Sequence, residues 1–458
     1  MRDGHIWYIV KLAGTAVQLE TGKEAYPMIF ANDFKCLTDS ATIEKAMENL
    51  DDDRMLVISP RKSDVEPERD WWLLDRAILL PENITVIIRN ATLKLSDDAR
   101  DNFFRSANCG FGFPDPERIR NIHIIGEGNA LLLGSDHPRA SGDSSKTIAR
   151  PCPYLDEDLC KYAYWVSDER KAEGKPSWED KHDYSYGTDA GKEGESQYGD
   201  WRGIGVLLAN VENFTVSGLT IKESHGWAIS CEACAFGRIE KIKLDATMSK
   251  MIDGMLHNME NQDGVDIRNG CHDIIITDIT GRTGDDIVAL TAIADKDFKE
   301  GGSLRTTHVM HNDWSRRDRN IHDIVIRNVV GYSNLCWGVR LLAAESNIWN
   351  VVIDGVIDTA PDGLLHGGMV LLGEVDGSYG RNLPDSIKNV TVSNVIAKGE
   401  GCIAVCGFVT DSCFTNIISK NTNCPAVNIY RENGLKNTLV SNVLAASGNV
   451  MEESFRKV

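Results

Sequence analysis

The sequence lacks a long hydrophobic run. Its N-terminal apolar stretch, Ile6 to Val10, is ended by Lys11. Such a stretch is too short for the core of a secretory signal or for a membrane-spanning helix. We therefore expect a cytoplasmic protein without a membrane partner, unless a leader has been removed, in which case it would be secreted.

Cysteines are too scattered for a disulfide framework, because the twelve are spread over 458 residues. Cys231 and Cys234 have the spacing of half a metal site, but no second CxxC or HxxxH motif follows them. We interpret most of the cysteines as buried free thiols. We expect no metal and no cofactor.

The sequence also has few basic residues relative to acidic ones, since 49 Lys and Arg against 68 Asp and Glu give a net charge of −19. An acidic chain repels nucleic acid, anionic membrane surfaces and polyanionic substrates unless a local basic site overrides the overall charge. We expect no nucleic-acid partner, and a substrate that is neutral or weakly charged.

A repeat is what the sequence does contain. From about residue 85, an Asn or Asp precedes alternating β-branched residues, as in NFTVSGLTI, HDIIITDIT and NVTVSNVIA. A second short apolar strand follows each copy, as in DGVDIRN and DDIVALT. Short strands joined by polar corners, with loops of varying length, indicate stacked coils. The anchors of the repeat are Phe214, Ile242, Ile274, Ile324, Val351, Val390, Ile417 and Thr438.

Tight hairpin signals such as Asn-Gly are sparse, which argues against an immunoglobulin-like sandwich or a propeller. We predict an all-β fold: a single right-handed parallel β-helix over residues 38–450, with a capping segment at 1–37 and a tail at 451–458. Two polar segments without periodicity, 137–202 and 292–319, are predicted loop insertions and are typical of functional lids. Because the ends of a β-helix need covering, either end could pack against a second copy of the chain, and the sequence leaves open whether the protein forms a homo-oligomer.

Three aspartates recur at one junction between turn and strand. Asp263 in NQDGVD lies 22 residues before Asp285, which Asp286 follows in TGDDI. Stacking of coils would bring these carboxylates together, with Asp266 near them. A single Asp at a corner caps the backbone, whereas clustered acids repel unless one keeps a proton or a cation lies between them. A protonated carboxyl beside an ionised one is the pair that glycosidic cleavage requires.

The ordered segments SATIEKAMENL, WWLLDRAILLPENITVIIRNATLKLSDD, ESHGWAIS, NQDGVDI, GDDIVAL and WGVRLL resemble the polygalacturonase-type glycoside hydrolases of family 28. The resemblance covers about 38–450 and implies a right-handed parallel β-helix. It implies that Asp285 is the general acid, while Asp263 and Asp286 activate water in an inverting displacement. It also implies that Asn261 orients Asp263.

Two departures from the family pattern concern the substrate. Arg340 matches the arginine of the Arg-Ile-Lys signature, but Leu342 stands at the lysine position. The Gly-His-Gly signature is absent, and His308 or His311 is a candidate replacement. A basic pair would bind a uronate carboxylate. Cleavage of polygalacturonate itself is therefore not implied.

Aromatic residues near the acids are further candidates. His225 and Trp227 lie about one coil before Asp263, and Trp337 lies near Arg340. A Trp ring could stack on a sugar or pack in the interior, and the sequence leaves both open. The candidate substrate-binding residues are Arg340, Asn261, Asp266, His225, Trp227, His308 and Trp337.

We expect a glycoside hydrolase that acts by exo-cleavage on a pectin-related or other plant or microbial oligosaccharide. One alternative is a β-helix lyase or epimerase acting on uronates, with calcium at the Asp cluster and Arg340 as the base. A second alternative is a carbohydrate-binding β-helix without activity, in which the three aspartates would be dispensable.

Overall fold

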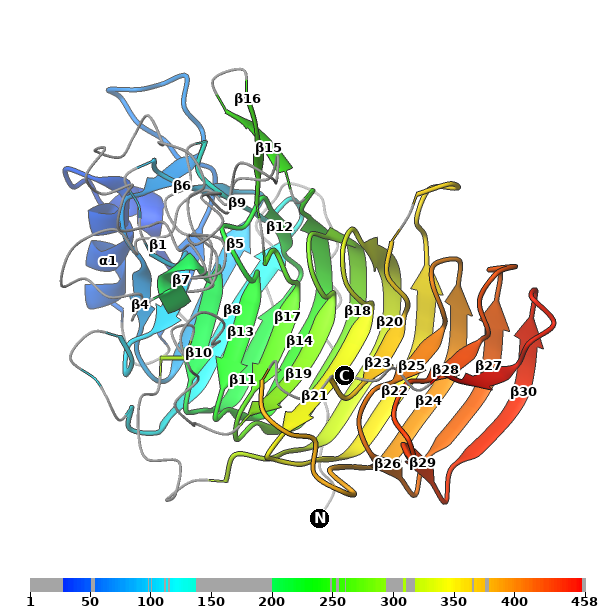
Figure 1. Cartoon of the computed structure of the whole chain (residues 1–458). Helices are drawn as coiled ribbons and strands as arrows, with labels where there is room; N and C mark the ends of the chain where they lie inside the picture. Colours follow the sequence, from blue (N-terminus) through cyan, green and yellow to red (C-terminus); the bar gives the residue numbers. More distant parts are fainter. Residues whose placement is uncertain are drawn as a thin grey trace, which may run out of the picture.

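The computed structural model describes residues 28–454, apart from 51–53, 98, 100, 111–112, 114–115, 137–199, 248, 253–254, 260, 294–307, 310–317, 365 and 375–378. The chain forms two long sheets that run side by side along one axis (Figure 1). Strands of successive coils pair in parallel in both sheets. The predicted all-β parallel β-helix is confirmed.

The strands of the two long sheets have the following bounds. The first sheet contains β1 (Ile29–Phe30), β2 (Met55–Ile58), β3 (Trp72–Leu74), β5 (Ile84–Arg89), β6 (Thr92–Leu95), β8 (Ile119–Glu127), β9 (Leu131–Leu133), β11 (Val211–Ser217), β12 (Thr220–Lys222), β14 (Ala235–Asp245), β18 (His272–Thr283), β20 (Ile321–Ser333), β22 (Ile348–Asp358), β24 (Ile387–Ala397), β26 (Val409–Thr410), β27 (Cys413–Ser419), β29 (Leu435–Lys436) and β30 (Leu439–Ala445). The second sheet contains β4 (Ile78–Leu80), β7 (Phe104–Ser106), β10 (Val206–Ala209), β13 (Ile229–Glu232), β17 (Val265–Arg268), β19 (Val288–Ile293), β21 (Val339–Ala344), β23 (Val370–Leu372), β25 (Ile403–Val405), β28 (Val427–Ile429) and β31 (Met451–Glu453).

Several shorter elements lie outside the two long sheets. An antiparallel hairpin of β15 (Ser249–Ile252) and β16 (Met255–Asn258) extends from one side (Figure 1). Two 3-10 turns occur in the part of the chain that the structure describes, η1 (Ala31–Asp33) and η2 (Asp200–Gly203). The described residues include one α-helix, α1 (Asp39–Glu48), and no helix among them is both long and apolar enough to cross a membrane.

Helix α1 lies at the N-terminal end of the β-helix (Figure 1). It begins after Thr38, whose hydroxyl oxygen accepts a hydrogen bond from the Ala41 N–H at 3.2 Å. Such a cap satisfies a backbone donor that the first helical turn leaves without a partner. The helix buries Ile43 and Ala46 in the main core, so it covers the first coils.

The expected ends and loops lie only partly within the described residues. Strand β1 lies in the segment expected as a cap and pairs with β2. Strand β31 lies in the segment expected as a tail and pairs with β28. Most of the expected loops at 137–202 and 292–319 falls outside the described residues. The expectation for Cys231 and Cys234 is confirmed, since both are free thiols and fully buried.

The register of the strands corrects two predicted anchors. Phe214 pairs with Gly237, which pairs in turn with Ile274. The predicted anchors Ile242 and Ile417 belong instead to a second inward column, farther along the same strands. The hydrophobic pattern missed Gly237 because a Cβ there would lie 2.0 Å from the Phe214 ring, which fills that space.

Asparagine recurs at the corners because the backbone there is left-handed. Asn121 and Asn213 have φ angles of 59° and 58°, a region that Asn adopts more readily than most residues. The Asn213 amide donates to the Asn121 side-chain oxygen at 2.6 Å, and Asn121 donates to Asn83 at 2.6 Å. This ladder links successive coils and explains the Asn or Asp that precedes each repeat.

Ile276→Ala should destabilise the protein far more than Ile275→Ala. Ile276 on β18 is fully buried and faces the core, whereas its neighbour Ile275 points outward and is 36% exposed. Large-to-small changes in a packed core cost about 2–5 kcal/mol. Denaturant unfolding would measure both variants, and an equal loss of unfolding free energy would contradict the register described above.

Candidate functional site

The aspartates lie at the corner where the long strands of the first sheet lead into the second sheet. Asp285 and Asp286 fall between β18 and β19, and Asp263 falls just before β17. The Ala228 N–H donates to the Asp263 carbonyl at 2.9 Å, and the Gly264 N–H donates to the Asp286 carbonyl at 2.8 Å. Asp263 therefore stacks with Asp286, one residue later than the repeat spacing suggested, and Asp285 lies beside this column.

Local hydrogen bonds shape the turn that carries the acids. The Thr283 hydroxyl donates to the Asp285 carbonyl at 2.5 Å, and one carboxylate oxygen of Asp285 accepts from the Asp286 N–H at 2.9 Å. One coil earlier, Asn261 has a φ of 55°. A Cβ on Gly264 would lie 2.3 Å from the Ile287 carbonyl oxygen, so only glycine permits this close stacking.

Burial dominates the electrostatics of the cluster. Asp263, Asp266 and Asp286 are 7%, 2% and 1% exposed. Burial, followed by the nearby carboxylates, raises the pKa of Asp263 well above its usual value. Burial also raises the pKa of Asp266, and it raises the pKa of Asp286 to about 7 against the pull of Arg340. The cluster therefore keeps protons at pH values where an exposed aspartate has lost its own.

Asp286 is the most firmly held of the acids. One of its oxygens accepts from the Trp337 N–H at 2.8 Å, and the other accepts from the Arg340 guanidinium at 3.3 Å. Arg340 also forms an ion pair with Glu374, and its guanidinium lies 5.4 Å from the Tyr379 ring centroid. Sequence reasoning missed Glu374 and Tyr379 because both lie beyond β23, in a segment without the repeat.

Leu342 shows what replaces the lysine of the family signature. It is 1% exposed and packs with Ile293 and Ala344, with Tyr379 beside them. An ammonium group in this apolar cluster would lose its hydration without gaining a partner. Arg340 is therefore the only member of the signature's basic pair in this chain.

His225 and Trp227 have interior contacts. His225 is buried, and its Nε2 accepts from the Ser135 N–H at 3.0 Å. Burial lowers its pKa to about 3, so the ring is neutral. Trp227 is 4% exposed, and the Arg268 guanidinium lies 4.6 Å from its ring centroid. Contact of either side chain with a sugar stays a prediction.

His308 joins a buried network of charged groups. Its Nδ1 lies 3.0 Å from a carboxylate oxygen of Glu232, and its Nε2 lies 2.5 Å from the Arg268 guanidinium. The Val309 N–H donates to the other Glu232 oxygen at 3.0 Å. The sequence analysis missed Glu232 and Arg268. Each is a charged residue in an otherwise apolar strand, and that pattern could have identified them. Substrate contact by His308 stays a prediction, and His311 lies outside the described residues.

Trp337 lies next to the acids but is only half-buried. Its backbone N–H reaches Asp286, and its indole packs over Gly368, where a Cβ would lie 2.2 Å from the ring. Glycine at 368 thus leaves room for the indole. Stacking of Trp337 on a sugar also stays a prediction.

One group of described residues brings metal-ligating atoms together. Ligand atoms of Asp285, Asp286 and Cys336 lie within 4.8 Å of one another. Calcium prefers six to eight oxygen ligands, whereas a thiol is a soft ligand. This group therefore fits poorly with the calcium that the lyase alternative requires.

Asp286→Asn should flatten the dependence of stability on pH. Because folding raises the pKa of Asp286 from 3.8 to about 7, the folded state binds more protons than the unfolded state between these values. Asp286 should therefore lower the unfolding free energy of the native chain by about 1.4 kcal/mol per pH unit as pH rises through this window, in addition to what Asp263 and Asp266 contribute. Denaturant unfolding at a series of pH values would measure the slope.

The control for this experiment is Asp385→Asn. Its side chain is 53% exposed, so the variant should keep the native slope. A native slope in a folded Asp286→Asn variant would show that Asp286 does not titrate in the window given above.

Comparison with known proteins supports a carbohydrate-active enzyme. The model of the glycosyl hydrolases family 28 matches residues 190–309, which include Asp263, Asp285 and Asp286. No curated protein sequence matches the chain.

Solved structures similar to this chain have diverse roles. A polygalacturonase from Erwinia carotovora ssp. carotovora is 13% identical, with a TM-score of 0.48, and the match covers 96% of this chain and 99% of that one. A family 28 exopolygalacturonase from Yersinia enterocolitica is 13% identical, with a TM-score of 0.42 and coverage of 91% and 78%. PfbA, a surface adhesin of Streptococcus pneumoniae, is 10% identical, with a TM-score of 0.41 and coverage of 94% and 93%.

At these identities and TM-scores, the structural similarities carry no argument about activity. The sequence match to the family rests on the segment that contains the acidic cluster. That match, with the buried aspartates at its centre, identifies the protein as a glycoside hydrolase that resembles family 28.

Proposed function

We propose that the protein hydrolyses a glycosidic bond at one end of a pectin-related oligosaccharide by acid and base catalysis. The observation that carries the proposal is the meeting of Asp263, Asp285 and Asp286 at one corner, within the segment that matches a hydrolase family. Glycosidic hydrolysis needs one carboxyl that donates a proton and one carboxylate that activates water. The cluster contains enough acids for both roles.

The contacts of Asp286 suit the activation of water. Trp337 and Arg340 fix both of its oxygens, so its orientation does not depend on substrate. A pKa of about 7 makes it a stronger base than an ordinary aspartate near neutral pH. By the family resemblance, Asp285 protonates the leaving oxygen. Burial raises the pKa of Asp263 well above its usual value, so Asp263 holds the water by a hydrogen bond while Asp286 accepts its proton.

The covered face of the second sheet supports exo-action. On β10, Leu207 and Ala209 belong to an apolar cluster separate from the main core, and they are 1% and 0% exposed. Trp201, Trp227 and Val309 pack in the same cluster. The N-terminal side of the acids is therefore covered. A substrate lying along the axis would extend from the acids toward the C-terminal coils.

The proposal includes inversion of configuration at the anomeric carbon. Inverting enzymes separate their two carboxyl groups by about 6.5–9.5 Å, which leaves room for water. Oxygens of Asp285 and Asp286 approach within 4.8 Å. Inversion therefore requires the Asp285 and Asp286 side chains to splay apart around the water, and proton NMR of the first anomer released would test it.

Arg340 argues against the lyase alternative. A base that removes a proton beside a uronate must be neutral, but the ion pairs with Asp286 and Glu374 stabilise the charged guanidinium. Burial alone would lower the pKa of Arg340, but these carboxylates outweigh it and hold the pKa above its usual value. Hydrolysis is the chemistry that the charges favour.

Asp285→Asn should lower kcat by about 10²–10⁴-fold, because an amide cannot protonate the leaving oxygen. Wild type and variant would be screened against pectin-derived oligosaccharides by reducing-sugar release and chromatography, with calcium and with EDTA. The matched control is Asp278→Asn on β18, at a corner where Asp278 accepts from Asn328 at 3.0 Å. This control should keep full activity.

The outcomes separate the three hypotheses for the site. Release of one monosaccharide by the wild type, unaffected by EDTA, supports the proposal. Unsaturated products that disappear with EDTA would support the lyase, and full activity of Asp285→Asn would contradict its role as the acid. Absence of turnover on every substrate would favour the binding protein. The cytoplasmic location expected from the sequence stays a prediction.

A further inference from the structure

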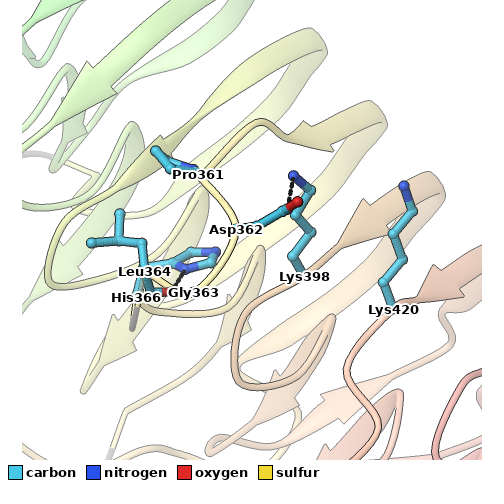
Figure 2. Close-up of a pocket in the computed structure, with 7 residues that line it drawn as sticks. All are labelled: Pro361, Asp362, Gly363, Leu364, His366, Lys398 and Lys420. Carbon is cyan, nitrogen blue, oxygen red and sulfur yellow. Dashed lines mark hydrogen bonds and ion pairs between the residues drawn. The ribbon is translucent and has the colours of Figure 1, made fainter.

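A pocket of about 420 Å³ lies at the same corner of the β-helix as the acids, several coils toward the C-terminus. Lys398 directly follows β24 and Lys420 directly follows β27, just as the turn carrying Asp285 and Asp286 follows β18. Figure 2 shows both lysines pointing the same way from neighbouring coils. The lining includes Pro361, Asp362, Leu364, His366, Lys398 and Lys420.

The register fixes how far the pocket lies from the acids. Strand β18 pairs with β20, β20 with β22, β22 with β24, and β24 with β27. At about 4.8 Å per strand, Lys398 lies about 14 Å and Lys420 about 19 Å along the axis from the acids. A short oligosaccharide spans this distance, on the side of the acids that the apolar cluster leaves uncovered.

One positive charge of the pocket has no counter-charge among the described residues. Lys398 lies 3.1 Å from a carboxylate oxygen of Asp362 (Figure 2). His366 pairs with the buried Asp358 at 2.8 Å. Lys420 is exposed, and although its backbone N–H donates to the Ala397 carbonyl at 2.8 Å, its ammonium group forms no hydrogen bond or ion pair with any residue that the structure describes. The pocket is therefore locally basic in a chain whose net charge is −19.

The wall of the pocket is built before any ligand arrives. The Asp358 carboxylate accepts the backbone N–H of Ala360 at 2.9 Å and that of Lys398 at 2.7 Å. Its loop packs directly on the preceding coil, because a Cβ on Gly367 would lie 1.5 Å from the Cys336 carbonyl oxygen. A preformed site spends less binding energy on ordering itself.

We propose that this pocket is a subsite for an anionic sugar, in which Lys420, assisted by Lys398, binds the carboxylate of a uronate unit. The inference rests on the proposed function for the path of the substrate, and it assigns recognition of a carboxylate to a place outside the catalytic corner. Leu342 removes one cation beside the acids. Lys420 supplies a cation a few sugar units away instead.

Lys420→Met should raise KM for an oligogalacturonide long enough to reach the pocket by about tenfold at low salt, the loss expected for one charge-assisted contact. KM for the same oligosaccharide with its carboxylates reduced to alcohols should not change, nor should KM for a disaccharide. The effect should shrink as salt screens the charge. Lys243→Met, at an exposed position on β14, is the matched control and should behave as wild type.

Asp362→Asn tests the same subsite, with KM expected to change in the opposite direction. Because Asp362 competes for Lys398, its removal should lower KM for the charged oligosaccharide and leave the reduced one unchanged. An unchanged KM in Lys420→Met, or an equal rise on charged and reduced oligosaccharides, would overturn the proposal.

A binding measurement separates failure of the subsite from failure of the proposed function. If the wild type hydrolyses no oligosaccharide, calorimetry with the oligogalacturonide still tests the pocket. The affinity should then fall in Lys420→Met and rise in Asp362→Asn. Equal affinity in wild type and both variants would overturn the subsite.

Discussion

Parallel pairing of each coil with the next is the interaction on which the rest of the structure depends. It repeats one spacing along the axis, so residues at equivalent positions form columns. Inward columns make the apolar core, and corner columns make the asparagine ladders. The same constraint places Asp263 over Asp286, because the backbone hydrogen bonds of adjacent coils fix which residues stack. The site is therefore a consequence of the repeat and not an addition to it.

The acidic corner is held together at a cost. Like charges in a buried place repel, and the proteins that keep them there use a proton, a counter-charge or fixed donors to do so. Here the Trp337 N–H and Arg340 donate to Asp286, while burial raises the pKa of Asp263 and Asp266 and so favours their protonated forms. The long core offsets this local strain. Such an arrangement separates stability, which the inward columns supply, from chemistry, which the corner supplies.

The two directions along the axis are not equivalent. Toward the N-terminus, an apolar cluster that includes Trp201 and Trp227 covers the outer face of the second sheet. Toward the C-terminus, the same corner carries Lys398 and Lys420 on successive coils. This asymmetry makes the two ends of a repeating solenoid chemically different. It also places a basic patch on a strongly acidic chain.

The sequence by itself determined the parallel β-helix and the meeting of the aspartates, because alternation of side chains and left-handed corners are local properties that repeat with the chain. Tertiary structure alone decided the register: Gly237 carries no hydrophobic signal, since the Phe214 ring fills its place. It alone decided the pairing of Arg340 with Glu374, and the enclosure of His308 between Glu232 and Arg268. These contacts join segments outside the repeat, and coil lengths vary with each insertion. No spacing in the sequence specifies them, because they depend on how loops fold back across neighbouring coils.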